Sequence, residues 1–154
     1  MAVMTKEEFA QHVKSNTLPM YRLAYSILQN SADAEDAVSE AIVHAYEKLE
    51  TLKKADSFRN WILQIAANEA KKIYRQNKRT SPVDWKENLS PEFYDEHHEL
   101  WDAVMQLDGG YRDVIVLFYY ERCTIPEIRR ILECRQGTVK SRLHRAKEQL
   151  RAML

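Results

Sequence analysis

The segment from Thr124 to Leu150, TIPEIRRILECRQGTVKSRLHRAKEQL, has the pattern of two short helices joined by a tight turn. Thr124 and Glu127 have the spacing of a capping box, in which a hydroxyl and a carboxylate satisfy the free amides of a helix start. Apolar residues then recur at helical spacing until Glu133, and the pattern resumes near Gly137. The segment therefore predicts a helix-turn-helix.

The second helix of this motif has two faces of different chemistry. One face is apolar and is expected to pack inward, whereas the other is cationic and rich in hydrogen-bond donors. Such a face suits the guanine edges and phosphates of a DNA major groove, although an ordinary solvated basic helix remains an alternative. The inward residues are Val139, Leu143, Ala146 and Leu150, and the outward residues are Lys140, Ser141, Arg142, His144, Arg145 and Lys147.

The chain has 154 residues and no net charge, but its charges are segregated along the sequence. Residues 71–79 contain five cations and no acid. Residues 80–108 carry one cation against eight acids, and residues 109–154 carry ten cations against five acids. Two basic surfaces separated by an acidic joint are predicted, and the length allows one ordinary domain or two small ones.

Three helices are predicted in the first fifty residues. Thr5 and Glu8 repeat the capping-box spacing and open a short helix that ends before Pro19. A second helix begins at Leu18 and ends at Asn30. Ser31 is expected to cap the third helix, whose acidic first turn complements the helix dipole. The inward stripe of the third helix is Ala34, Ala37, Val38, Ala41, Ile42, Ala45 and Leu49, and its outward residues are Asp36, Ser39, Glu40, Val43, His44 and Glu47.

A fourth helix follows the loop at residues 50–57 and is capped by Asp56 or Ser57. Its first half has apolar residues at threes and fours, including Trp61, and its last part, Lys71 to Arg79, is strongly basic. We expect the first half to build a core and the second half to lie beside an anion.

Residues 80–91 are rich in serine, proline and asparagine and predict a linker. A helix over residues 100–107 is expected to end at Gly109 and Gly110. The segment YRDVIVLFYY, Tyr111 to Tyr120, is either a buried strand or a buried helix, and a helix is favoured because no second strand is evident. The predicted fold is all-α, with two small helical domains joined by a flexible linker and a C-terminal four-helix unit that contains the helix-turn-helix.

Several classes of protein are disfavoured by the sequence. No apolar run is long enough to span a membrane, and no secretion signal precedes residue 30, so a cytoplasmic location is expected. Cys123 and Cys134 lack the spacing of a zinc site and are expected to be free thiols. The acidic and histidine residues at 95–99 match a solvated face better than a metal site. No phosphate-binding loop, activated nucleophile or HExxH motif is present, so we expect neither an enzyme nor a bound cofactor.

Four segments in this order resemble the extracytoplasmic-function (ECF) sigma factors of bacterial RNA polymerase. They are SADAEDAVSEAIVHAYEKL (residues 31–49), SFRNWILQIAANEAKKIYRQNKR (57–79), YRDVIVLFYYE (111–121) and GTVKSRLHRAKEQLR (137–151). The resemblance covers nearly the whole chain and implies a two-domain transcription initiation factor. It implies a region 2 domain at residues 1–79, an acidic linker at 80–96 and a region 4 domain at 97–154.

The resemblance implies three partners, which are core RNA polymerase, promoter DNA and an anti-sigma factor, and it implies no direct insertion into a membrane. It also implies which residues contact the polymerase and the DNA. Trp61 lies on the helix that matches the DNA-melting helix of the family, but its spacing from Phe58 and Ile65 is that of a core residue. Capture of a flipped base requires a pocket and a cationic track for the phosphates. The implied contacts are Asp36, Ser39 and Glu40 for polymerase, Asn68, Lys71, Lys72 and Arg75 for the minus 10 element, and Lys140, Ser141, His144 and Arg145 for the minus 35 element.

Some positions depart from the family pattern. Ser39 stands in place of a more usual glutamine, and Arg129 stands where a small residue usually lets two helices approach. Glu133 replaces a frequent glycine at the turn, and residues 135 and 136 replace a common Pro-Val pair. Two other classes stay open. One is a plain DNA-binding regulator that uses only the helix-turn-helix, with the N-terminal helices serving dimerisation. The other, suggested by Arg129 and Glu133, is a sigma-like decoy that binds polymerase or an anti-sigma protein without initiating transcription.

Overall fold

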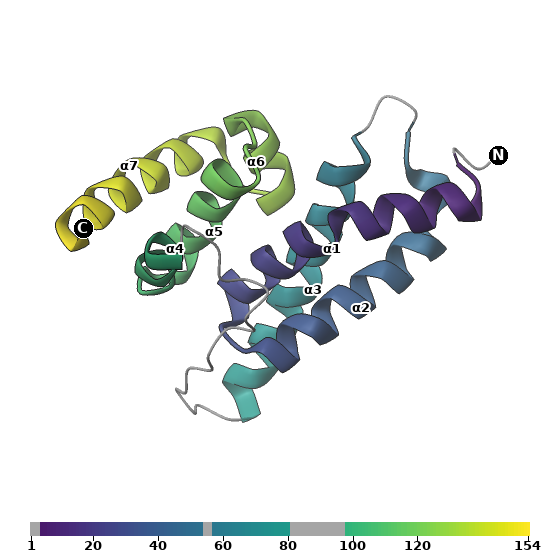
Figure 1. Cartoon of the computed structure of the whole chain (residues 1–154), viewed down its shortest axis with the longest axis horizontal. Helices are drawn as coiled ribbons and strands as arrows, with labels where there is room; N and C mark the ends of the chain where they lie inside the picture. The colour runs from purple at the N-terminus through teal and green to yellow at the C-terminus, as the bar shows by residue number, and fades with distance from the viewer. Residues whose placement is uncertain (1–3, 54–56, 81–97) are drawn as a thin grey trace.

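The computed structural model describes residues 4–53, 57–80 and 98–154, which form helices in two groups and contain no strand (Figure 1). The N-terminal unit comprises α1 (Lys6–Leu28), α2 (Ser31–Glu47), the 3-10 turn η1 (Leu49–Thr51) and α3 (Phe58–Thr80). The C-terminal unit comprises α4 (His98–Met105), α5 (Gly109–Ile115), the π-helical segment η3 (Val116–Tyr120), α6 (Ile125–Leu132) and α7 (Gln136–Met153).

The predicted all-α fold with two helical units is confirmed. The exact domain boundaries stay predictions, and the linker proper, after residue 80, lies outside the described residues. None of the described helices has both the length and the apolar character that a membrane crossing requires.

Helix α1 is a single helix where two were predicted. Its start is as expected. Thr5 Oγ1 accepts a hydrogen bond from the Glu8 amide at 3.1 Å, and the Glu8 carboxylate accepts one from the Thr5 amide at 3.0 Å. The predicted break at Pro19 is wrong, since α1 continues through Pro19 to Leu28. An internal proline costs about 3 kcal/mol. Buried side chains on both sides of it, from Phe9 to Ile27, offset this cost at about 1.5 to 3 kcal/mol for each large apolar group.

The three long helices of the N-terminal unit pack against one another. Ala37 and Ala41 of α2 are fully buried, which lets α1 and α3 approach closely. The predicted cap at Ser31 is wrong by one residue: Asn30, in an extended conformation, accepts the Asp33 amide at 2.8 Å, and Ser31 is already helical. At the start of α3, Ser57 Oγ accepts the Asn60 amide at 3.4 Å, whereas the alternative cap, Asp56, lies outside the described residues.

The C-terminal unit contains the apolar segment as a helix, which resolves the choice between helix and strand. Val114 and Leu117 are fully buried, but Tyr119 is exposed. The expectation that Gly109 and Gly110 end the preceding helix is wrong, because α4 ends at Met105 and both glycines begin α5 after Asp108. The last turn of this segment is π-helical, a distortion that no apolar periodicity indicates.

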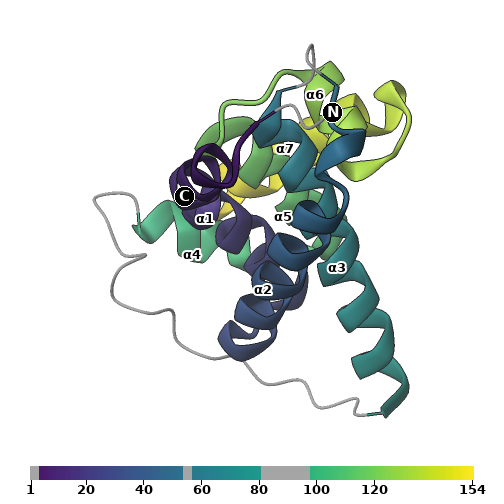
Figure 2. The same ribbon diagram turned by 90° about the vertical axis from the view of Figure 1, so that its right-hand side faces the viewer.

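Figure 2, which is turned by 90°, shows the C-terminal end of α3 extending away from the other helices. The basic residues of this end therefore lie on a projecting helix. By contrast, α3 packs against α1, α2 and α6 through apolar residues that are buried in its first half, including Phe58, Ile62 and Leu63. The predicted division of α3 into a core half and a basic half matches this arrangement.

Candidate nucleic-acid interface

The helix-turn-helix forms as predicted from α6 and α7. Thr124 Oγ1 accepts the Glu127 amide at 3.3 Å, and the Glu127 carboxylate accepts the Thr124 amide at 2.8 Å. This backbone hydrogen bond holds the pKa of Glu127 below its ordinary value. Ile128 and Val139 are fully buried and fix the packing of the two helices. Helix α6 ends at Leu132, and its C-cap residue, Glu133, has a φ of 54°, in the left-handed region.

The four residues predicted for the minus 35 element lie exposed on α7. Lys140 and His144 are one turn apart, and so are Ser141 and Arg145, so the four form two neighbouring rows on the helix surface. The His144 Nε2 atom lies 2.8 Å from a carboxylate oxygen of Glu148, another exposed residue of the same helix. The structure thus brings the predicted set together on one cationic face.

Two residues predicted to face outward on α7 are half-buried instead, which corrects the expectation for Arg142 and Lys147. The Lys147 ammonium lies 4.9 Å from the centre of the Phe118 ring, an attractive cation–π distance. The Arg142 guanidinium packs against Gly110 at the start of α5. Arg142 thus packs on α5 and Lys147 on the aromatic rings of η3, which simple helical periodicity does not reveal.

The predicted polymerase-binding residues lie together on the exposed face of α2. Asp36, Ser39 and Glu40 follow the spacing of one helix face, and all three are exposed. Helix α2 lies on the side of the N-terminal unit away from α6 and α7 (Figure 1). A side-chain contact that the sequence did not indicate joins α2 to α3, with His44 Nδ1 2.5 Å from a carboxylate oxygen of Glu69.

The predicted minus 10 residues on α3 do not all have the same environment. Asn68, Lys72 and Arg75 are exposed on one strip of the helix. Lys71 is half-buried, and its ammonium donates a hydrogen bond to the backbone carbonyl of Leu132 in α6 at 3.1 Å. Trp61 is half-buried with its ring centre 5.7 Å from that of Phe58, in agreement with its core-like spacing.

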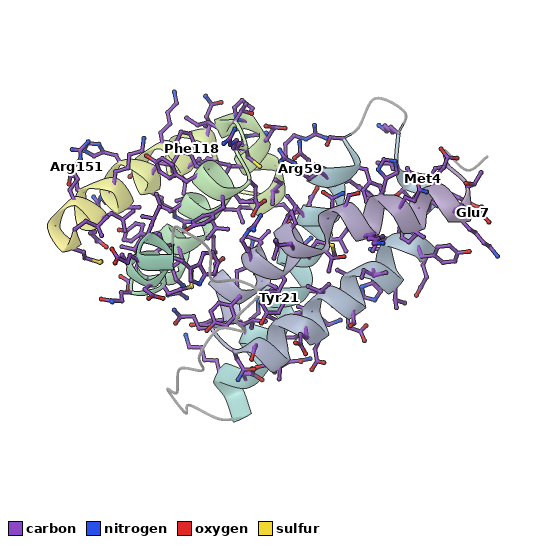
Figure 3. All side chains as sticks on the ribbon, in the orientation of Figure 1. Met4, Glu7, Tyr21, Arg59, Phe118 and Arg151 are labelled. Atoms are coloured by element: carbon purple, nitrogen blue, oxygen red, sulfur yellow. The ribbon has the colours of Figure 1, made fainter. Side chains whose placement is uncertain are left out.

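A set of polar contacts between the two units was missed by sequence reasoning. Arg22 of α1 makes two hydrogen bonds to the Glu121 carboxylate, at 2.7 and 3.0 Å. Arg59 of α3 donates to the backbone carbonyl of Glu121 at 2.6 Å, and Figure 3 shows Arg59 at the junction of the two units. Asn60 donates to Glu127 at 2.6 Å. These partners are 62 to 99 residues apart, and no sequence pattern pairs them.

Arg112 and Asp113 add a second junction between the units. The Arg112 guanidinium is buried and donates to the backbone carbonyls of Ser26 and Leu107. Asp113 accepts a hydrogen bond from the Ser26 hydroxyl at 3.0 Å, but its removal from water raises its pKa to about 6. Burial also lowers the pKa of Arg112. Two adjacent charges inside the apolar segment YRDVIVLFYY were the one available signal for this junction.

The remaining sequence predictions concern thiols and metals. Cys123 and Cys134 are free, as predicted, and burial raises the pKa of Cys123 to about 11. The acidic and histidine residues at 95–97 lie outside the described part of the chain. Within the part that is described, no three potential metal ligands are grouped.

Comparisons with known proteins agree with this arrangement. Residues 12–80 match the Sigma-70 region 2 family model and residues 97–150 match the Sigma-70, region 4 model. RNA polymerase sigma factor SigV of Bacillus subtilis is 30% identical over 97% of this chain and 93% of its own length. ECF RNA polymerase sigma factor SigW of the same species is 30% identical over 97% of this chain and 90% of its own length.

Solved structures show the same fold. Sigma factor RpoE of Bartonella quintana, in complex with the anti-sigma factor NepR, has a TM-score of 0.79 at 22% identity and covers 95% of this chain and 96% of its own. CnrH, in complex with the cytosolic domain of CnrY, has a TM-score of 0.73 at 24% identity and covers 97% of this chain and 88% of its own. Together with the two family models and the relatives of matching length, the order of the helices identifies the chain as a member of the ECF group of sigma-70 family RNA polymerase sigma factors.

Proposed function

We propose that this chain binds core RNA polymerase in the cytoplasm, directs it to promoters and helps to open the DNA, as a binding factor and not as an enzyme. One observation carries the proposal: besides the helix-turn-helix, the N-terminal unit carries two separate exposed polar surfaces, an acidic one on α2 and a basic one at the end of α3. A regulator that only binds DNA through α7 requires neither surface.

The acidic surface is the proposed polymerase contact. Asp36, Ser39 and Glu40 are exposed and adjacent, and none of them makes a hydrogen bond or ion pair with another side chain in the described structure. Carboxylates that are free of internal partners can pair with basic groups of another protein without breaking contacts in this chain. Residues 1–79 would then act as the region 2 domain.

The two basic surfaces are the proposed promoter contacts. Asn68, Lys72 and Arg75 are free to follow a phosphate backbone, and Lys140, Ser141, His144 and Arg145 are the proposed minus 35 residues of a region 4 domain at 97–154. Lys71 joins the minus 10 group only when its hydrogen bond to Leu132 breaks. The proposal therefore includes a movement of the Lys71 side chain away from α6 when DNA binds.

Control by an anti-sigma factor is part of the proposal. Its support is the similarity to sigma factor RpoE, whose structure was solved in complex with the anti-sigma factor NepR. The polar contacts between the two units provide surfaces that a second protein can use, because each has hydrogen-bonding groups that can change partner.

The deciding experiment is co-migration with core RNA polymerase, followed by promoter-dependent transcription. The charge reversal Asp36→Lys with Glu40→Lys should abolish stoichiometric co-migration while leaving the helical circular dichroism spectrum intact. The matched control is Glu47→Lys with Glu50→Lys, which reverses two exposed charges outside the proposed contact. Wild-type binding without transcription from any promoter would favour the decoy, and no wild-type binding would favour the plain regulator.

A further inference from the structure

The exposed minus 10 residues of α3 are neighbours of residues that contact α6. Asn68 lies four positions after Gln64, and Arg75 lies four positions after Lys71, so each pair is adjacent on the helix surface. Asn60 precedes Gln64 by the same interval. Asn68 and Arg75 are exposed, whereas the other three are half-buried. Helix α6 therefore lies along one edge of a continuous polar surface on α3.

The groups that α6 and its C-cap residue present to this edge are all hydrogen-bond acceptors, and two of the three are carboxylates. A DNA strand presents the same chemistry, because its phosphate oxygens and many atoms of its base edges accept hydrogen bonds. The acceptors of α6 thus occupy donors that a DNA strand would use. The pairs are Asn60 with Glu127 at 2.6 Å, Gln64 with Glu133 at 2.7 Å, and Lys71 with the Leu132 carbonyl at 3.1 Å.

Two features of this contact are unfavourable by themselves. Glu133 has a φ of 54°, a conformation that favours glycine, yet it is the residue whose carboxylate reaches Gln64. The Oδ1 atom of Asn60 is buried and has no hydrogen-bond partner, a cost that water would relieve if α6 moved away. The chain thus keeps a charged acceptor against α3 at a local cost, and the buried amide of Asn60 favours release.

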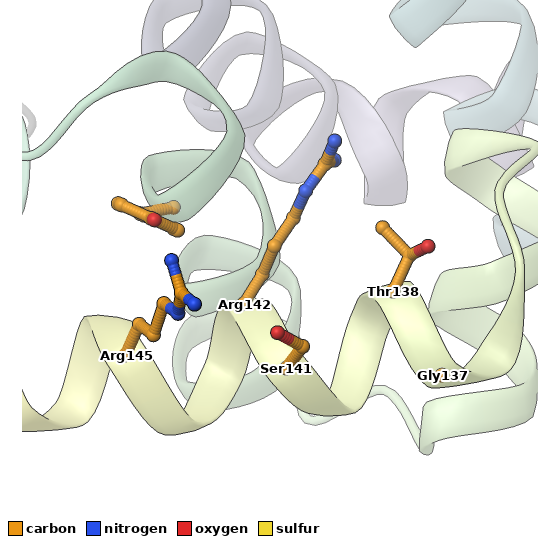
Figure 4. Close-up of a pocket in the computed structure, with 6 residues that line it drawn as sticks. Gly137, Thr138, Ser141, Arg142 and Arg145 are labelled. Carbon is orange, nitrogen blue, oxygen red and sulfur yellow. The ribbon is translucent and has the colours of Figure 1, made fainter.

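The minus 35 face is separate from this contact. Figure 4 shows Ser141 and Arg145 projecting from α7, and neither residue takes part in the three hydrogen bonds between α3 and α6. An effect of opening this contact can therefore be assigned with variants of α3 that leave α7 unchanged.

Arg22 of α1 helps to hold the two units together at a place outside the α3 surface. Its guanidinium makes two hydrogen bonds to the carboxylate of Glu121, whose side chain is only 3% exposed. Without Arg22 this carboxylate would be buried without its cation, and opening would relieve that state by exposing Glu121 to water. Apolar contacts also join the units, among them Tyr25 with Trp101. Substitution of Arg22 thus weakens the closed arrangement without changing α3.

We propose that the closed arrangement is autoinhibited for DNA binding, because acceptors of α6 cover one edge of a single-strand-binding surface on α3. When α6 moves away, Asn60 and Gln64 join the minus 10 residues as DNA-binding side chains. The inference rests on the proposed function, since it concerns the regulation of the same minus 10 surface. It adds that the free chain binds single-stranded DNA weakly, and that opening activates a surface that is already formed.

The first test measures binding of a fluorescent single-stranded DNA of mixed sequence to the full chain without polymerase. Arg22→Gln removes a cation, so charge alone predicts weaker binding, whereas opening predicts binding about tenfold tighter than wild type. Lys14→Gln is the matched control, because it removes a cation from an exposed site on the same helix, and it should bind no tighter than wild type. Arg22→Lys keeps the charge without the planar fork and should lie between. Adding Lys72→Gln to Arg22→Gln should weaken the gained binding, which would place the DNA on α3.

A reversible cross-link tests the proposal in the opposite direction. Gln64→Cys and Glu133→Cys, introduced into Arg22→Gln together with Cys134→Ser, place two thiols where the native side chains meet at 2.7 Å. A bismaleimide with an internal disulfide joins these thiols, and the buried Cys123 should not react. The linked chain should lose single-strand binding. Reduction of the linker should restore binding while both half-linkers stay attached, so the adducts serve as their own control.

The outcomes separate the proposal from its alternatives. Folded Arg22→Gln that binds the single strand no better than Lys14→Gln overturns the proposal, and so does a linked chain that binds as well as the reduced one. A gain in binding that Lys72→Gln does not weaken also overturns it, because the DNA then lies elsewhere. If circular dichroism shows that Arg22→Gln is unfolded, the cross-link in a chain that retains Arg22 decides alone.

Failure of the proposed function is distinguishable from failure of the autoinhibition. A chain that binds polymerase and initiates transcription, but whose single-strand binding ignores the cross-link, supports the proposed function and overturns only the autoinhibition. A chain that fails to bind polymerase, but whose single-strand binding is lost on cross-linking and regained on reduction, shows the opposite: the covered surface is real and the proposed function is wrong.

Discussion

Each helical unit is packed around fully buried apolar side chains, whereas the seam between the two units combines apolar contacts, which join the two cores, with a set of hydrogen bonds and an ion pair. In the N-terminal unit Leu23 and Ile62 are fully buried, and in the C-terminal unit Ile115 and Ile128 are fully buried. The polar contacts across the seam join Asn60 to Glu127, Gln64 to Glu133, Lys71 to Leu132, and both Arg22 and Arg59 to Glu121. An aromatic contact of Tyr25 with Trp101 lies beside the seam.

This difference indicates which contacts can be exchanged during function. A buried apolar side chain has no alternative partner in water, but a hydrogen bond within the protein contributes only about 0.5 to 1.5 kcal/mol net because water can replace it. The polar contacts of the seam can therefore be exchanged at a lower cost than unfolding either core. Exchange of the hydrogen bond to the Leu132 carbonyl would free the ammonium of Lys71.

The largest expected effect comes from opening a cavity in a core. Leu23→Ala should lower the free energy of unfolding by about 2 to 5 kcal/mol, since it removes buried methyl groups from α1 where α2 and α3 pack. Urea denaturation followed by circular dichroism measures it. The control Lys72→Ala, at an exposed site, should stay within about 0.5 kcal/mol of wild type. Equal losses in the two variants would contradict the assignment of Leu23 to the core.

A smaller effect is expected at the seam. Glu121→Gln removes the charge that pairs with Arg22 and should weaken the contact between the units by about 1 to 3 kcal/mol. The Arg22 side chain is 21% exposed, so water can solvate the freed guanidinium, and the loss should be smaller than in a core. Fluorescence transfer between labels on α2 and α7 should show a longer mean distance.

The control for the seam variant is Glu148→Gln, which removes the partner of His144 on the exposed surface of α7. An exposed pair contributes little, so the distance between the labels and the unfolding free energy should stay as in wild type. A seam that keeps its wild-type distance in Glu121→Gln would show that apolar contacts, including Tyr25 with Trp101, hold the units together.

The junction at Asp113 adds a pH dependence. Its pKa in the folded state is about 6, above its ordinary value of 3.8, so the folded state binds the proton more tightly than the unfolded state. The contribution of Asp113 to stability is therefore fully present below about pH 4, falls as the pH rises from 4 to 6, and is lost above 6, with a total change of about 1 to 2 kcal/mol after discounting for solvent access.

Asp113→Asn tests this dependence because asparagine stays neutral and can still accept a hydrogen bond from Ser26. Urea unfolding at pH 4, 5, 6 and 7 should show that the variant gains stability relative to wild type as the pH rises. A difference between the two proteins that is constant over this range would mean that Asp113 does not titrate there. The comparison of two proteins at each pH removes the contribution of the other titrating groups.

Local signals in the sequence predicted most of the helices and both capping boxes, but not the cap of α2. The capping boxes at Thr5 and Thr124 were readable because they involve residues three apart, and the buried stripe of α7 was readable from its spacing. The same local reasoning failed at Pro19, where packing of α1 against two other helices overrides a residue that disfavours helix. It failed also for the π-helical turn, since a single distorted turn leaves the apolar pattern nearly unchanged.

The exposed residues of the candidate site could be predicted from the sequence, but the contacts that its other residues make within the chain could not. The exposed faces of α2 and α7 follow from helical periodicity, and the family resemblance selects residues within them. The hydrogen bond of Lys71 to Leu132 and the position of Arg142 against Gly110 depend on how separate helices dock. Such contacts join residues that are distant in the sequence, so one sequence alone contains no local signal for them.

The smallest expected effect concerns Glu133, which both ends helix α6 and makes a hydrogen bond across the seam. Its φ of 54° is a left-handed conformation that disfavours glutamate by about 1 kcal/mol relative to glycine, and its carboxylate accepts a hydrogen bond from Gln64 across the seam at 2.7 Å. Glu133→Gly should relieve the backbone strain and remove the seam contact together. Because that contact is exposed, the relief should dominate, and the unfolding free energy should rise by about 0.5 kcal/mol while the seam loosens.

Glu133→Asn separates the two contributions, because asparagine tolerates the left-handed conformation and has a side chain too short to reproduce the glutamate contact. Both variants should be at least as stable as wild type in urea, and both should show a slightly longer distance between the labels on α2 and α7. A loss of stability in both would mean that the hydrogen bond to Gln64 outweighs the backbone strain at this turn. The seam would then stabilise α6 itself, and the contrast between apolar cores and an exchangeable polar seam would no longer hold at α6.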